Sequence, residues 1–93
     1  MAVRVVVPPA VQADIEAAGA YIAEQGNLQA ALELVDKLQA KCASLSLLPE
    51  RGAPYRERYR RVFEGRYQII YRLEDRETVV VVHHMSRAAP EGL

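Results

Sequence analysis

Two histidines and an arginine stand close together near the end of the chain, in the stretch VVVVHHMSRAAP at residues 79–90. Histidine exchanges protons near neutral pH, and arginine binds phosphate through the N–H donors of its planar guanidinium group. His83 and His84 are expected on a strand, where adjacent side chains point to opposite faces. They therefore act singly and cannot bind one metal ion together. We expect one to be packed and the other to be open for proton transfer or phosphate contact, with Arg87 just past the strand.

All the basic residues of the second half of the chain are arginines. They are Arg51, Arg56, Arg58, Arg60, Arg61, Arg66, Arg72, Arg76 and Arg87. These nine and six acidic residues give residues 51–93 a charge of +3, whereas residues 1–50, with three basic and six acidic residues, carry −3. The asymmetry suits an anionic partner for the second half. Surface ion pairs on a solvated face explain the same count more simply, so charge alone assigns no partner.

Some of these arginines follow the alternation of an expected strand. Arg58 and Arg60 would then share a face and form a basic strip with Arg72. Tyrosines are interleaved with them, namely Tyr55, Tyr59, Tyr67 and Tyr71. Basic residues beside aromatic ones suit single-stranded RNA. The clean alternation of Tyr67, Ile69, Tyr71 and Leu73 favours the other interpretation, in which Tyr67 and Tyr71 belong to the core.

Several kinds of chemistry are absent from the pattern. The chain has no phosphate-binding glycine loop, no nucleophile elbow and no zinc-enzyme spacing, so we expect neither a metal nor a cofactor. Its one cysteine, Cys42, lies on an apolar helix face and is expected in the core, which fits a reducing compartment. The N-terminal apolar run of three valines is too short for a signal peptide or a membrane span. We expect a single domain over residues 1–93 that is soluble, cytoplasmic and away from membranes.

The first half of the chain predicts a strand and two helices. Residues 3–7 are β-branched and are ended by two prolines. Apolar residues at helical spacing predict one helix over 10–25 and a second from Leu28 to the stop at Pro49. Gly26 is placed to end the first helix, and Asn27 to cap the second. Three further leucines are expected to widen the apolar stripe of the second helix, namely Leu32, Leu34 and Leu48.

The second half predicts a long loop and three strands. The loop covers residues 49–61, and the strands cover 60–65, 66–73 and 78–85, with a tight turn at Glu64-Gly65. Short turns make these strands antiparallel. The order β-α-α-β-β-β predicts an α+β fold, a helical hairpin packed on a small, mainly antiparallel sheet.

Four stretches in this order resemble the RelE/ParE family of toxins from bacterial type II toxin–antitoxin systems. They are ADIEAAGAYIAEQ (13–25), LSLLPERG (45–52), GRYQIIYRL (65–73) and VVVVHHMSR (79–87), the last with the family's closing histidine and arginine. The resemblance runs from residue 4 to 87 and implies one RelE/ParE-like toxin domain. It also implies a cognate antitoxin protein that neutralises the toxin, and contact with operator DNA only through that antitoxin.

The resemblance implies one of two targets. RelE-like members resemble ribosome-dependent, metal-independent endoribonucleases that cut mRNA, with basic side chains stabilising the developing charge. ParE-like members instead bind DNA gyrase and trap it on DNA without catalysis. The RelE-like branch commonly has an arginine where this chain has Gln68, and a tyrosine or histidine near the C-terminus, whereas no tyrosine follows Tyr71 here. We therefore favour the ParE-like branch, with gyrase as target, over the RelE-like alternative with ribosome and mRNA.

Site residues follow from this comparison. For target binding we nominate Arg58, Arg60, Arg61, His84 and Arg87. In the RelE-like alternative the catalytic set would be His84 for proton transfer, with Arg61, Arg66 and Arg87 as charge stabilisers. The antitoxin-binding residues stay open, although an apolar groove beside the helices and sheet is the expected place.

Overall fold

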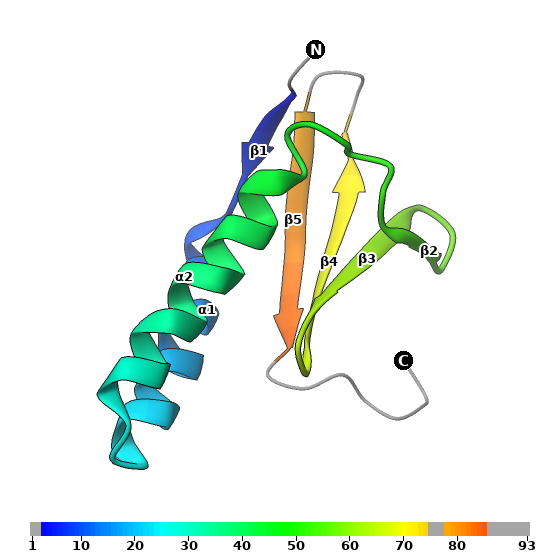
Figure 1. Ribbon diagram of the computed structural model, residues 1–93. Helices are drawn as coiled ribbons and strands as arrows, with labels where there is room; N and C mark the ends of the chain where they lie inside the picture. The colour runs from blue at the N-terminus through cyan, green and yellow to red at the C-terminus, as the bar shows by residue number, and fades with distance from the viewer. Residues whose placement is uncertain (1–2, 75–77, 86–93) are drawn as a thin grey trace.

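Two antiparallel helices pack against a five-stranded sheet in the computed structural model of the chain, which describes residues 3–74 and 78–85 (Figure 1). The elements are β1 (Arg4–Val6), α1 (Pro9–Glu24), α2 (Leu28–Ser44), β2 (Ala53–Tyr55), β3 (Tyr59–Glu64), β4 (Tyr67–Leu73) and β5 (Thr78–Met85). The strand order is β1-β5-β4-β3-β2, and only the β1–β5 pairing is parallel. The predicted α+β fold is confirmed, with one additional strand, β2.

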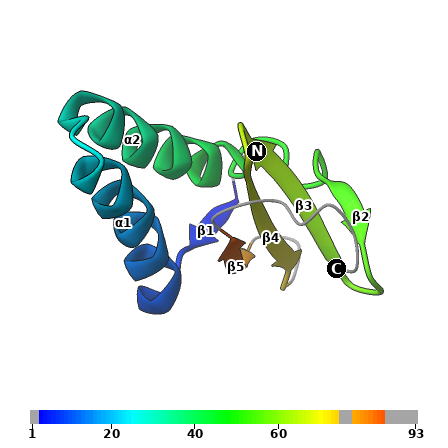
Figure 2. The same cartoon turned by 90° about the horizontal axis from the view of Figure 1, so that it is seen from below.

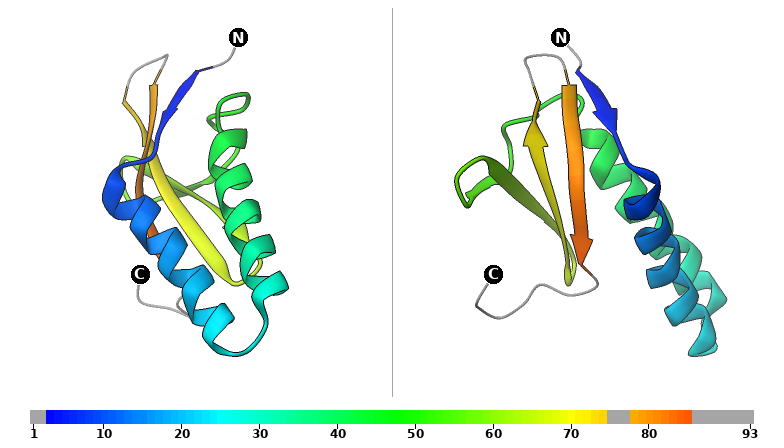
Figure 3. Two further views of the ribbon diagram at one scale, coloured as in Figure 1. Left: turned by 90° about the vertical axis from the view of Figure 1, so that its left-hand side faces the viewer. Right: turned by 180° about the vertical axis from the view of Figure 1, so that it is seen from behind.

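The helical hairpin follows the predicted signals closely. Pro9 stands in the first turn of α1, where its missing N–H leaves no hydrogen bond unmade. Gly26 takes a φ of +89° just past the end of α1, a conformation that suits glycine. The side chain of Asn27 then caps α2, because its oxygen accepts the N–H of Ala30 at 3.0 Å. Seen from their own side, the two helices run in front of the strands (Figure 3, left).

The second helix ends five residues before the predicted stop at Pro49. The carbonyl of Ser46 accepts the N–H of Val3 at 2.8 Å, so this segment pairs with the start of β1 instead of continuing the helix. The predicted wide apolar stripe is therefore wrong at two positions. Leu48 lies outside α2 and is 64% exposed, and Leu32 is 55% exposed on the side of α2 turned from the core.

Strand β2 was missed because its signal is short. It holds three residues, Ala53, Pro54 and Tyr55, inside the region predicted as a loop. Pro54 has no N–H to donate, and such a residue is tolerated only at a sheet edge, which is where β2 lies. The turn that joins β2 to β3 covers residues 56–58. Strand β2 stands at the edge of the sheet farthest from β1 (Figure 1).

The core lies between the helices and one face of the sheet (Figure 2). Its fully buried side chains come from both layers: Ile15, Leu38, Leu45, Ile69 and Tyr71. Gly19 lets α1 approach α2 closely, because a Cβ at this position would lie 2.5 Å from Cγ2 of Val35. Neither described helix has the length and hydropathy that a membrane span requires.

Cys42 belongs to this core, as predicted, and makes the stability of the fold dependent on pH. Burial raises the pKa of its thiol from 9.0 to about 11. Below pH 9 the thiol keeps its proton in both the folded and the unfolded chain. Between pH 9 and 11 only the unfolded chain releases the proton, so the free energy of unfolding falls as the pH rises through this window. At 1.36 kcal/mol per pKa unit, the loss reaches about 2–3 kcal/mol.

This expectation is checked by urea denaturation of the wild type and of Cys42→Ala between pH 8 and 11. The variant is less stable throughout because it leaves a small cavity, but its stability should fall less steeply above pH 9. Parallel pH curves for the two proteins would show that the thiol does not contribute.

Candidate functional site

A tyrosine and an arginine fix the loop after α2 to the sheet. The Tyr71 hydroxyl donates to the carbonyl of Pro49 at 2.7 Å and accepts the N–H of Gly52 at 2.9 Å. Nη1 of Arg60 donates to the carbonyls of Gly52 at 2.8 Å and Glu50 at 3.2 Å. A Cβ on Gly52 would lie 2.6 Å from the Tyr71 oxygen, so only glycine fits here. Residues Pro49 and Gly52 of the sequence thus belong to a loop whose backbone makes two hydrogen bonds with the Tyr71 hydroxyl.

The same contacts decide what the Tyr71 hydroxyl does chemically. Burial raises the pKa of Tyr71, and the hydrogen bond from Gly52 and the charge of Arg60 offset only part of that rise. The hydroxyl is therefore neutral at physiological pH, with both its donor and an acceptor site occupied. Its arrangement is that of a structural group, and the interpretation of Tyr71 as a core residue is confirmed.

On the opposite face of the sheet, arginines and aromatic rings form a cluster that we call the arginine platform: Tyr55, Arg56, Arg61 and Phe63. The guanidinium of Arg61 lies 4.9 Å from the ring centre of Tyr55 and 5.4 Å from that of Phe63. Its Nη1 also donates to Oε1 of Gln68 at 3.2 Å. Arg56 covers the same Tyr55 ring at 5.2 Å. Phe63 is 45% exposed, so the platform faces outward.

The register of the β3–β4 hairpin assembles this platform. A two-residue turn at Gly65 and Arg66 pairs Phe63 with Gln68, which places Arg61 diagonally across from Gln68 on one face. Sequence reasoning counted Gln68 only as a missing positive charge and overlooked its role as the hydrogen-bond acceptor for Arg61. The signal was available, because a two-residue turn sets which residues face each other. Arg66 stands in the turn itself and does not join the platform.

The predicted strip of Arg58, Arg60 and Arg72 is wrong. Strand β3 begins only at Tyr59, so Arg58 lies in the turn before it and outside the alternation. Arg60 and Arg72 lie on opposite faces, since Arg60 pairs with Tyr71, the residue before Arg72. Arg72 instead makes an ion pair with Glu74 at 3.0 Å. Of the arginines nominated for target binding, Arg61 lies on the platform and Arg58 lies near it. Arg60 instead donates hydrogen bonds to the loop after α2.

The two histidines are placed by the backbone of β5 alone. His83 pairs with Ile70, which pairs with Arg61, so His83 stands in the same row of the sheet as the platform. His84 pairs with Ile69, a fully buried core residue. Arg87 lies outside the described residues, and the side chain of His84 is likewise not described. The roles assigned to His84 and Arg87 therefore stay predictions.

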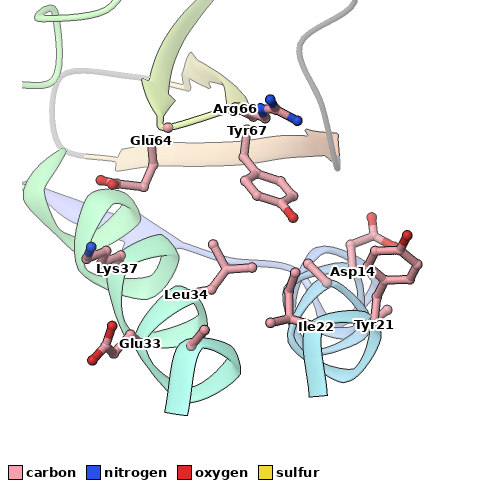
Figure 4. A pocket seen from close by; sticks show the side chains of 13 residues that line it. Asp14, Tyr21, Ile22, Glu33, Leu34, Lys37, Glu64, Arg66 and Tyr67 are labelled. Carbon is pink, nitrogen blue, oxygen red and sulfur yellow. The ribbon is translucent and has the colours of Figure 1, made fainter. Parts of the chain in front are cut away.

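A groove opens between the helices and the tip of the β3–β4 hairpin (Figure 4). Its lining residues are Asp14, Ala17, Ala18, Tyr21, Ile22, Ala30, Glu33, Leu34, Lys37, Glu64, Gly65, Arg66 and Tyr67. The side chains of Ile22, Leu34 and Tyr67 point toward one another across it. Charged residues of both signs stand among this apolar set, and the Tyr21 ring is 55% exposed. A partly apolar groove is thus present beside the helices and sheet, and the binding of an antitoxin there stays a prediction.

A helical hairpin on a small, mainly antiparallel sheet is the fold expected of a RelE/ParE-type toxin. The family model described as "ParE toxin of type II toxin-antitoxin system, parDE" matches residues 5–89, nearly the whole chain. The chain therefore belongs to the ParE toxin family and is the toxin component of a type II toxin–antitoxin system. Toxins of this family pair with antitoxins. Comparison with curated proteins gave no match.

Proposed function

We propose that this toxin inhibits DNA gyrase by binding it and that a cognate antitoxin neutralises it. The observation that carries the proposal is the match of the ParE toxin family over residues 5–89. Gyrase acts on the cell's DNA, so the toxin acts in the cytoplasm. Contact with operator DNA is expected only through the antitoxin.

The geometry supports binding over catalysis. Three polar side chains on the second half of the fold already have structural partners: Tyr71 and Arg60 hold the loop, and Arg61 is held by Gln68 and two rings. A ribonuclease of the RelE-like kind needs positioned cations and a proton-transfer group converging on one phosphate. At the position where that branch carries an arginine, this chain has the fully buried Gln68.

The groove supports a protein partner. Its apolar centre at Ile22, Leu34 and Tyr67 suits apolar side chains of an antitoxin segment. Asp14, Glu33 and Lys37 around that centre would select a segment that presents charges of the opposite sign. Target contact is assigned to Arg58 and Arg61, and the predicted target-binding residues His84 and Arg87 are kept as part of this proposal.

The test is a supercoiling assay with purified gyrase, relaxed plasmid and the toxin. We expect loss of supercoiling or accumulation of cleaved plasmid at micromolar toxin, and recovery on addition of the antitoxin encoded beside it. No effect on gyrase would contradict the proposal. Ribosome-dependent cuts in mRNA that disappear in His84→Ala would replace it with the RelE-like alternative.

A further inference from the structure

We propose that the arginine platform binds single-stranded DNA directly, so that the toxin holds the DNA of its gyrase complex as well as the enzyme. The inference deepens the proposed function and rests on it for the choice of DNA.

The charge around the platform is concentrated on the β2–β3 hairpin and the loop before it. Residues 51–61 hold five arginines and one glutamate, a local charge of +4 in a chain with no net charge. Arg56 and Arg58 are exposed, and neither makes an ion pair within the described part of the chain. Guanidinium groups of this kind bind phosphate through two parallel hydrogen bonds. A strand of phosphates is therefore the complementary ligand for the turn at residues 56–58.

The aromatic part of the platform selects single strands. Phe63 is 45% exposed and stands beside Arg61, which is itself stacked on Tyr55. Exposed rings among arginines bind successive bases by stacking while the arginines follow the backbone. A duplex hides the faces of its bases inside the stack, so only an unpaired strand can use this surface.

The backbone at Arg56 gives an independent reason for a ligand. Arg56 takes a φ of +59°, the left-handed region that glycine occupies without strain and that an arginine adopts at a cost. The Arg56 side chain is exposed, and within the described residues the interaction found for it is the cation–π contact with the Tyr55 ring. Residues held in sparsely populated backbone conformations cluster at active sites and ligand-binding sites. The backbone conformation of Arg56 is explained if its guanidinium, held beside Tyr55, binds a phosphate.

The proposal is tested by fluorescence anisotropy of a labelled oligodeoxythymidylate titrated with the toxin alone, without gyrase. Wild type should bind with an affinity that falls as salt rises. Arg56→Gly should weaken binding about tenfold and reduce the salt slope by about one, while its denaturation midpoint stays equal or rises. Phe63→Ala should weaken binding about tenfold through lost stacking. Arg72→Gln is the matched control, since Arg72 is already paired with Glu74, and it should bind as wild type does.

Each of the other outcomes would contradict a part of the proposal. Absence of oligonucleotide binding, or equal binding by Arg56→Gly and wild type, would overturn the platform proposal and leave gyrase inhibition untouched. Tighter binding to a duplex or to oligouridylate would overturn the choice of single-stranded DNA. If the platform variants lose oligonucleotide binding while wild type never inhibits gyrase, the DNA contact stands and the proposed function fails.

Discussion

Replacing Tyr71 by phenylalanine is expected to lower the free energy of unfolding by about 2–4 kcal/mol, although the two residues differ by one oxygen. That oxygen accepts the N–H of the buried Gly52 at 2.9 Å and donates to the carbonyl of Pro49 at 2.7 Å. Without it, the buried N–H of Gly52 and the half-buried carbonyl of Pro49 lose their partner, and an unsatisfied buried group costs about 1–3 kcal/mol. A loss of this size is a large part of the stability of a small domain.

The measurement is chemical denaturation of the purified toxin, with Tyr59→Phe as the matched control. Tyr59 lies on the neighbouring strand β3, and its hydroxyl makes no hydrogen bond within the described residues. Its change should stay within about 0.5 kcal/mol of wild type. If Tyr71→Phe proves equally mild, the loop at residues 49–52 must be held by other contacts, with Arg60 the first candidate.

This contact also shows where prediction from sequence reached its limit in the fold. The helices were predictable because each has its own local signals, such as Gly26 at the end of α1 and the Asn27 cap. Strand β2 has three residues and a proline, too short for any periodicity to appear. It forms because residues 49–52 are tied to Tyr71 and Arg60 about twenty and ten positions later in the chain. Such long-range hydrogen bonds leave no trace in a local pattern.

The candidate site was predictable in residue type but not in arrangement. Arginines were nominated because their chemistry suits anions, and Arg61 does lie on an outward-facing cluster. Arg58 leaves the alternation because β3 begins only at Tyr59, and the β3–β4 pairing of Arg60 with Tyr71 puts Arg60 and Arg72 on opposite faces. The role of Gln68 depended on the same register. The pairing of Arg60 with Tyr71 and of Phe63 with Gln68 follows once the hairpin turn is placed at residues 65–66, one position later than the predicted turn at Glu64-Gly65.

The largest effect on partner binding is expected from Ala17→Arg, which should weaken antitoxin binding about 100-fold. Ala17 lines the groove from α1, and its side chain is exposed there in the free toxin. A long charged side chain at this position fills the space an antitoxin residue would take and places a charge beside the apolar centre. Arginine is a good helix former and Ala17 is not buried, so the toxin should fold normally.

The matched control is Ala20→Arg, the same substitution three residues later on the same helix. Ala20 is also exposed but does not line the groove, so both variants change charge and helix propensity alike. Titration calorimetry with the cognate antitoxin should find Ala20→Arg close to wild type and Ala17→Arg much weaker. In cells that make the antitoxin, Ala17→Arg should then restore toxicity, since the variant keeps its target surface on the far side of the sheet. Equal antitoxin affinity for the two variants would show that the antitoxin binds elsewhere, and the groove would need another occupant.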